Sequence, residues 1–209
     1  MLGVEWSSNS RPMHDVDLAV SNNCLIAVPE DFKASGEQTL ASNEKLLVIG
    51  AINQNQPSTS YQVRGNEFKV DFVTSLKHNE PPKEGSSYIT ELKTYAHKLR
   101  FIGFLLENTQ KAVVLNKTVI LVNVPDPARF ALYKLAISGK RPAVDQINSR
   151  KDLAQAAQLI EVLLAARPGD LWRAIDSAKR YAEPKFAAML LKMLDRLLQA
   201  IVPGFANME

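Results

Sequence analysis

The chain has 209 residues, of which 46% are hydrophobic and 22% charged, and its formal net charge is +3 at pH 7. This composition predicts an ordinary globular protein with a sizeable core and excludes a polybasic tract. The single cysteine, Cys24, excludes an intramolecular disulfide framework. Since the sequence has neither a signal-like pattern nor an apolar run of about 20 residues, it predicts a cytoplasmic protein without a membrane span.

The first half of the chain is predicted to contain strands joined by loops. Strands are expected over 15–20, 46–51, 61–64 and 68–74. The Gly65-Asn66 pair between the last two is a typical hairpin turn. The stretch 78–87 contains Pro81-Pro82 and Gly85-Ser86-Ser87, which predict a loop.

The pattern changes from strand-like to helical in the second half. Apolar runs predict strands over 99–106, 112–115 and 119–124. Asp126 and Pro127 then predict a helix start, because Asp caps free N–H groups and Pro suits the first helical position; Gly139 ends this helix. Further helices are expected from a cap at Ser149 to residue 166, over 170–181 and over 184–202.

Within the helix expected after Ser149, apolar residues are spaced to form one buried stripe. The stripe comprises Leu153, Ala156, Ala157, Ile160, Leu163 and Leu164. The whole pattern indicates an α/β (α+β) fold, with a strand-rich part over 1–125 and a helical subdomain over 126–209.

Two carboxylates near the start of the chain are the first candidate site. Asp15 and Asp17 are separated by one residue at the beginning of the strand expected over 15–20. Residues i and i+2 of a strand share a face, so the two acids would lie side by side. Such a pair can hold Mg²⁺, which leaves its other positions to water and substrate phosphates. The alternative is that both acids are solvated residues at a strand start.

Four segments together resemble the nucleotidyltransferase superfamily. They are the acid-x-acid of Asp15 and Asp17, the segment 67–73 with Asp71 between apolar residues, and the later blocks 124–135 and 149–156. The order of these blocks is similar to that of a bacterial family of nucleotidyltransferase-like proteins and, more distantly, of abortive-infection toxin nucleotidyltransferases.

The resemblance implies a fold, a metal and substrates. It implies a nucleotidyltransferase-like mixed sheet with a helical subdomain, and Mg²⁺ or Mn²⁺ held by catalytic acids Asp15, Asp17 and Asp71. It also implies a nucleoside triphosphate substrate, a hydroxyl acceptor on RNA, protein or a small molecule, and, for a toxin, an antitoxin partner. Asp71 could instead be a solvated acid on an exposed strand face, and Glu67 is a less well placed substitute.

The helical blocks supply candidate nucleotide-binding residues. Lys134 shares a helix face with Phe130 and Ala131, where a charge is costly unless it meets an anion. A phosphate or an active-site carboxylate would satisfy it; a Met in its place would then preserve the fold. The resemblance implies binding roles for Lys134, Lys151 and Asp152, and Arg129 lies near the same helix ends. The alternatives are that the stem of Lys134 covers apolar surface while its charge stays in water, and that Asp152 in the first helical turn is favoured by the helix dipole alone.

One departure from the family leaves two functional hypotheses open. Family members carry a Gly-Gly or Gly-Ser pair on a helix before the first acids, and no such pair precedes Asp15 in this chain. The departure suggests an N-terminally incomplete or altered member. The chain is therefore either a Mg-dependent transferase of nucleoside monophosphate groups or a non-catalytic module of the same fold that binds nucleotide, RNA or protein.

Overall fold

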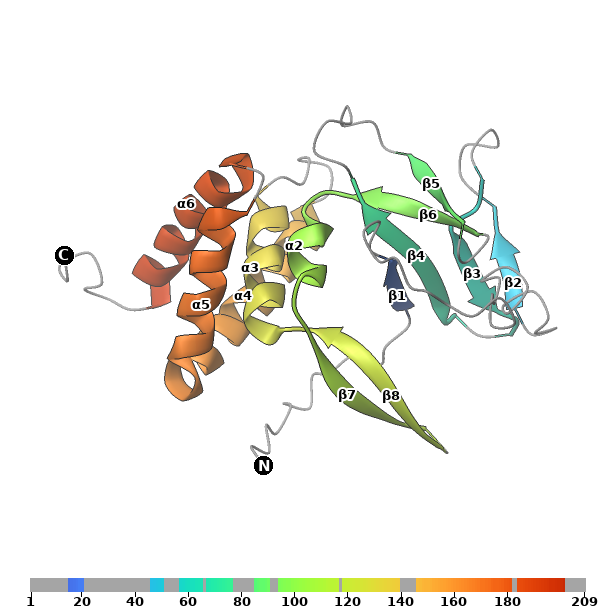
Figure 1. The fold of residues 1–209 in the computed structure, drawn as a ribbon, viewed down its shortest axis with the longest axis horizontal. Helices are drawn as coiled ribbons and strands as arrows, with labels where there is room; N and C mark the ends of the chain where they lie inside the picture. Colours follow the sequence, from blue (N-terminus) through green and yellow to red (C-terminus); the bar gives the residue numbers. More distant parts are fainter. Residues whose placement is uncertain are drawn as a thin grey trace. The chain divides into compact units, whose positions relative to one another are not determined.

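The computed structural model describes the secondary structure of most of the chain (Figure 1). The described residues are 15–20, 46–50, 57–65, 67–76, 85–90, 94–116, 118–139, 146–181 and 184–201. Contacts within the chain define two compact units. One comprises Met1–Ser75 and Pro81–Leu99, and the other comprises Leu76–Glu80 and Arg100–Glu209. We call them the sheet unit and the helical unit.

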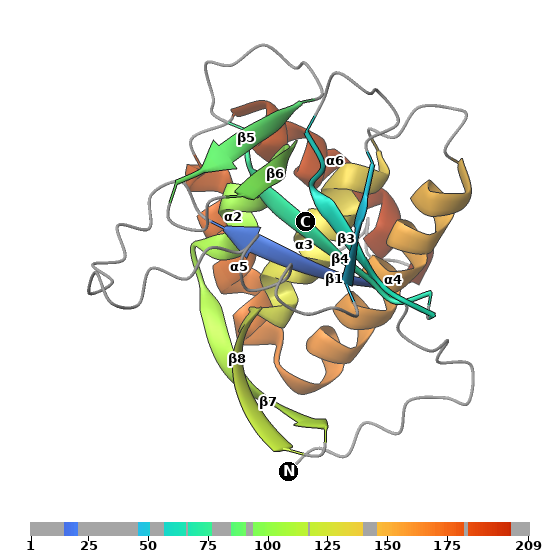
Figure 2. The ribbon, with the colours of Figure 1, turned by 90° about the vertical axis from the view of Figure 1, so that its right-hand side faces the viewer.

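The sheet unit is a mixed sheet built around one central strand. Its strands are β1 (Asp15–Val20), β2 (Leu46–Ile49), β3 (Ser60–Val63), β4 (Lys69–Ser75), β5 (Ser86–Ile89) and β6 (Thr94–Leu99). β1 runs parallel to β4 along most of its length (Figure 2). The first half of β4 also pairs with antiparallel β3 and its second half with parallel β6. β4 is therefore bordered by three strands.

The predicted hairpin is present between β3 and β4. Gly65 has φ 75°, a left-handed conformation that glycine adopts without steric cost. The Val63 N–H donates to the Phe68 carbonyl at 3.0 Å, which closes the turn. The strands expected over 15–20, 46–51, 61–64 and 68–74 are confirmed within the described residues. The loop prediction for 78–87 is wrong at its end, because Ser86 and Ser87 belong to β5, which pairs with β6.

One face of this sheet carries a buried hydrophobic cluster. Tyr61, Phe72, Ile89 and Ala96 are buried together, and the Tyr61 and Phe72 rings meet edge to face with centroids 5.8 Å apart. The Tyr61 hydroxyl forms a buried hydrogen bond with the Thr94 hydroxyl at 3.2 Å. Because side chains alternate along a strand, the residues directly before and after each of these buried residues point to the opposite face of the sheet.

The helical unit contains one hairpin and five described helices. Its elements are α2 (Ile102–Leu106), β7 (Thr109–Asn116), β8 (Thr118–Pro125), α3 (Pro127–Ser138), α4 (Gln146–Ala166), α5 (Pro168–Arg180) and α6 (Pro184–Ile201). β7 and β8 contain the strands predicted over 112–115 and 119–124, and they pair antiparallel. α3 packs against the other four helices, and its Ala131, Leu132 and Leu135 have no exposed surface. α3 is thus the core of this unit.

The start of α3 matches the prediction in detail. Asp126 is the N-cap, and its carboxylate accepts hydrogen bonds from the N–H groups of Ala128 at 3.0 Å and Arg129 at 3.1 Å. Pro127 occupies the first helical position and Gly139 follows the last residue. The predicted helices after residue 166 are also present, as α5 and α6.

Two expectations for the helical unit are wrong. The run 99–106 is not a strand, because Leu99 ends β6 and Ile102–Leu106 form the short helix α2. α4 begins at Gln146, so Ser149 is inside the helix and its hydroxyl donates to the Ser138 carbonyl at 2.7 Å instead of capping. The side chain of Ser149 therefore ties α4 to the end of α3.

The predicted apolar stripe of α4 is correct in part. Ala156, Ile160 and Leu163 are buried, but Leu153 is 37% exposed. Its neighbour Asp152 is buried instead, at 2% exposure. The packed face of α4 therefore includes a carboxylate where periodicity predicted a leucine.

The mixed sheet and the helices after Asp126 confirm the α+β fold class. The contacts place the β7–β8 hairpin in the helical unit. The functional domain boundary expected between residues 125 and 126 stays a prediction. None of the described helices combines the length and apolar character needed to cross a membrane.

Candidate functional site

Asp17 and Asp71 are direct neighbours on adjacent parallel strands. The register pairs Asp17 of β1 with Asp71 of β4. In-register residues of neighbouring strands point to the same face, and neighbouring strands are about 4.8 Å apart. The two acids therefore lie side by side although 53 positions separate them in the sequence.

This acidic pair lies on the sheet face opposite the buried Tyr61 and Phe72. Phe72 follows Asp71 directly and is 4% exposed, so alternation turns Asp71 the other way. Asp17 is exposed and Asp71 is half-buried. Both positions are accessible to a ligand.

Asp15 precedes Asp17 by two residues on β1, and its backbone pairs with Lys69. Its side chain lies outside what the structure describes. Among the described residues, no three His, Cys, Asp or Glu side chains are grouped closely enough for a metal ion. Convergence of Asp15, Asp17 and Asp71 on one metal therefore stays a prediction.

The donor chemistry of Asp17 and Asp71 fits a hard divalent cation. Both are carboxylates, which Mg²⁺ and Mn²⁺ prefer, and Mg²⁺ commonly takes one or two protein carboxylates and completes its shell with water and phosphate. The two acids come from paired strands, which fix their spacing through backbone hydrogen bonds. A site of this kind is preorganised by the sheet.

His97 lies on the sheet face that carries Asp17 and Asp71, and it was not among the predicted site residues. β6 pairs His97 with Val73, two residues beyond Asp71 on the same face of β4. The His97 side chain is half-buried. β3 pairs with the first half of β4, where its Ser60 lies directly beside Asp71. The strand β6 was not predicted, so the position of His97 beside β4 follows from the structure alone.

In the helical unit, two of the predicted binding residues pair with each other. The Lys134 ammonium lies 2.8 Å from the Asp152 carboxylate, which joins α3 to α4. The Asp152 side chain is 3% exposed and that of Lys134 is 20% exposed. The expectation that Lys134 meets an anion is thus met by Asp152. The Lys134 ammonium also lies 5.5 Å from the centre of the Phe130 ring.

Arg129 is buried and uses its guanidinium within the helical unit. It donates to the Phe104 carbonyl, to the Glu107 carboxylate at 2.9 Å and to the Ser177 hydroxyl. Its guanidinium carbon lies 4.6 Å from the centre of the Phe104 ring. These contacts hold α2, α3 and α5 together. Lys151, by contrast, is exposed on α4.

Paired, accessible carboxylates can hold a divalent cation that in turn binds phosphate groups. The model of a family described as nucleotidyltransferase matches residues 1–180. The chain therefore belongs to this nucleotidyltransferase family. No curated protein and no solved structure matches it.

Proposed function

We propose that the protein is a Mg²⁺-dependent nucleotidyltransferase that moves a nucleoside monophosphate group from a nucleoside triphosphate to a hydroxyl acceptor. The observation that carries this proposal is the in-register pairing of Asp17 with Asp71 in a chain of the nucleotidyltransferase family. General transfer of a nucleotide is what the family implies. The metal and the residues are our proposal.

Asp15, Asp17 and Asp71 are the proposed ligands of the ion. Bound Mg²⁺ would neutralise charge on the triphosphate during the transfer. Mn²⁺, which takes similar oxygen ligands, is the alternative ion. The exposed position of Asp17 and the half-buried position of Asp71 support this assignment, because both can contact a ligand that enters from solvent.

Asp71 has a second proposed role, as the base for the acceptor hydroxyl. The hydroxyl oxygen forms a bond to the α-phosphorus, the bond from that phosphorus to the bridging oxygen breaks, and pyrophosphate leaves. The hydroxyl proton passes to the Asp71 carboxylate. A carboxylate can act in this way when it lies within hydrogen-bond reach of the proton it removes.

Lys134, Lys151, Asp152 and Arg129 are the proposed nucleotide-binding group of the helical unit. Lys151 is exposed and free to approach a phosphate, and Lys134 keeps part of its side chain accessible. Asp152 and Arg129 are buried and engaged within the unit, so their proposed contribution is to hold the neighbouring groups in position.

A second candidate function is nucleotide, RNA or protein binding without turnover. Binding of a nucleotide by a chain that transfers none would favour this candidate.

Incubation of the full chain with each α-labelled nucleoside triphosphate, Mg²⁺ and a pool of RNA and protein acceptors tests the proposal. Label should appear in one acceptor, and Asp17→Asn and Asp71→Asn should each abolish the transfer. Glu67→Gln is the matched control, since Glu67 is an exposed acid four residues before Asp71. Transfer that persists in both Asn variants would refute the assignment.

A further inference from the structure

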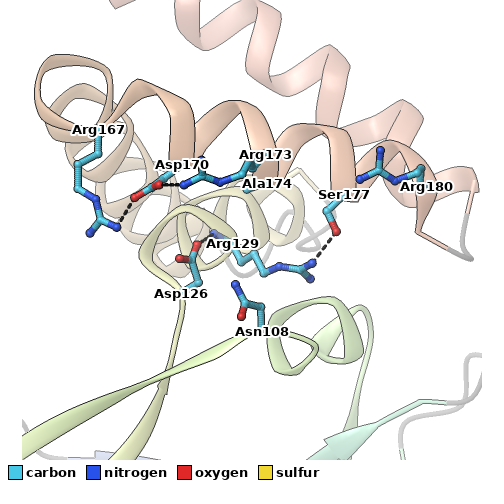
Figure 3. A pocket seen from close by; sticks show the side chains of 9 residues that line it. All are labelled: Asn108, Asp126, Arg129, Arg167, Asp170, Arg173, Ala174, Ser177 and Arg180. Carbon is cyan, nitrogen blue, oxygen red and sulfur yellow. Dashed lines mark hydrogen bonds and ion pairs between the residues drawn. The ribbon is translucent and has the colours of Figure 1, made fainter.

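The helical unit contains a polar pocket along one face of α5, with a cavity volume of about 370 Å³ (Figure 3). Residues three or four apart on a helix share a face. α5 accordingly lines the pocket with Asp170, Arg173, Ala174, Ser177 and Arg180. The remaining lining residues are Asn108, Asp126, Arg129 and Arg167. We call this cavity the arginine pocket.

Arg129 crosses the pocket and fixes its shape. Figure 3 shows its guanidinium reaching from α3 to Ser177 on α5. Glu107 accepts from the same guanidinium at 2.9 Å, so the charge of Arg129 is balanced inside the unit. Because the Ser177 oxygen accepts from Arg129, the Ser177 hydroxyl hydrogen is left to point elsewhere, and an anion in the pocket would accept it.

The pocket carries more positive than negative charge after its ion pairs are counted. Its lining holds four arginines and two aspartates. Asp170 is shared by Arg167 and Arg173, which leaves that group of three with one net positive charge. Arg180 is exposed and forms no ion pair with any other residue that the structure describes.

The two positive charges left after these ion pairs lie at different positions along α5, and Asp126 adds one negative charge to the lining. Asp170 holds Arg173 toward the start of the helix, whereas Arg180 is its last residue. Arg180 follows Arg173 by seven positions, which is about two helical turns or about 10 Å. The pocket therefore presents two separate cationic positions.

The rest of the lining indicates which part of a ligand would be recognised. Of the described lining residues, Ala174 alone is apolar, and none is aromatic. A base or an acyl chain would find neither a ring to stack on nor an apolar wall. Arginine instead matches phosphate oxygens with paired N–H donors.

We propose that the arginine pocket binds a ligand with more than one phosphate group, held by Arg173 at one position and by Arg180 with the Ser177 hydroxyl at the other. Such phosphates are carried by a nucleoside triphosphate or by the backbone of a nucleic-acid strand. This inference goes beyond the transfer reaction, because Arg173, Ser177 and Arg180 belong neither to the proposed metal site nor to the proposed nucleotide-binding group.

Binding of two probes to the full chain tests the proposal. Tripolyphosphate is titrated by calorimetry, and a short fluorescein-labelled single-stranded oligonucleotide by anisotropy. Arg173→Gln and Arg180→Gln should each weaken binding of at least one probe about five- to tenfold, the effect expected for one lost charge-assisted contact. Both side chains are exposed, so the fold should survive the changes.

Two further variants make the result specific. Arg196→Gln removes the same charge from an exposed position on α6 outside the pocket, and it should change affinity less than twofold. Asp126→Asn keeps an oxygen for the helix cap and removes a negative charge from the lining, so it should strengthen binding.

The pattern across the probes identifies the source of the phosphates. Weaker oligonucleotide binding indicates a nucleic-acid backbone if the salt dependence of the affinity also falls, in each variant, by the amount expected for about one phosphate contact. Loss confined to tripolyphosphate indicates a nucleotide. Either pattern supports the pocket. Equal affinities for wild type, Arg173→Gln, Arg180→Gln and Arg196→Gln would overturn it, as would no binding of either probe.

The test separates this inference from the proposed function. Asp71→Asn lies in the sheet unit and should leave binding to the arginine pocket unchanged. If transfer needs Asp71 but the arginine variants bind normally, the pocket is wrong and the function stands. If transfer persists in Asp71→Asn while the arginine variants lose binding, the function is wrong and the pocket stands.

Discussion

The Lys134 ammonium and the Asp152 carboxylate are 2.8 Å apart, and Asp152 is almost wholly buried between α3 and α4. This pair changes what a substitution at Lys134 is expected to do. A carboxylate taken out of water needs a compensating cation or hydrogen bonds. The pair is therefore part of the packing of the helical unit as well as a candidate binding group.

Lys134→Met is expected to destabilise the protein by about 3 kcal/mol, because it leaves the Asp152 carboxylate buried without its cation. The sequence alone suggested that Met would preserve the fold. Asp152→Asn in the Met background should recover part of the loss, since a neutral amide is less costly to bury. Urea unfolding of the single and double variants measures both effects. A double variant no more stable than Lys134→Met would contradict the explanation.

Arg129→Met should destabilise the helical unit by about 3 kcal/mol, because burial of partners left without hydrogen bonds is costly. The Phe104 carbonyl, Glu107 and Ser177 all lose a donor in this variant. Arg173→Gln is the matched control, because its side chain is 77% exposed, and it should change stability by less than about 0.5 kcal/mol. Equal unfolding midpoints for the two variants would show that the Arg129 contacts are unimportant.

Asp126→Ala should cost about 1 kcal/mol, the usual effect of losing an N-cap. Its carboxylate satisfies two N–H groups at the start of α3, the core helix of its unit. Asp126→Asn should retain most of this stability, because the amide oxygen can accept the same hydrogen bonds. Thermal unfolding of both variants decides the matter, and an Asn variant as unstable as the Ala variant would exclude capping as the reason.

Mn²⁺ binding is expected to depend on the paired acids of the sheet unit. Removal of a supporting group around a metal costs about 10–100-fold in affinity, so loss of a direct ligand in Asp17→Asn or Asp71→Asn should cost at least about tenfold. Glu67→Gln should bind Mn²⁺ as wild type does. Electron paramagnetic resonance of free Mn²⁺ measures the affinities. Wild-type affinity in both Asn variants would remove Asp17 and Asp71 from the metal site.

Local signals in the sequence were sufficient for several elements. The Gly65 turn, the Asp126 cap with Pro127, and the alternation in β4 each act over a few residues, so the sequence specifies them directly. The acid-x-acid at Asp15 and Asp17 was likewise visible, and the family match over residues 1–180 agrees with the resemblance that it suggested.

Short elements held by distant contacts were not predictable in this way. α2 has five residues, too few to show a helical period, and is preceded by Phe101 with φ 61°, an unusual conformation for a residue other than glycine. Phe101 is buried, with its ring centre 4.8 Å from that of Phe186 in α6. Packing against the distant helix α6 stabilises α2 at that position, and the neighbouring sequence carries no signal of this packing.

The sequence by itself determined the residue types of the acidic site, the turns and caps, and the change from strands to helices near Asp126. Tertiary structure decided which of these residues meet. The register that pairs Asp17 with Asp71, the burial of Asp152 beside Lys134, and the gathering of Arg129, Arg173 and Arg180 around one cavity all join distant segments. Their physical reason is packing and strand pairing across the fold, which local propensity cannot specify.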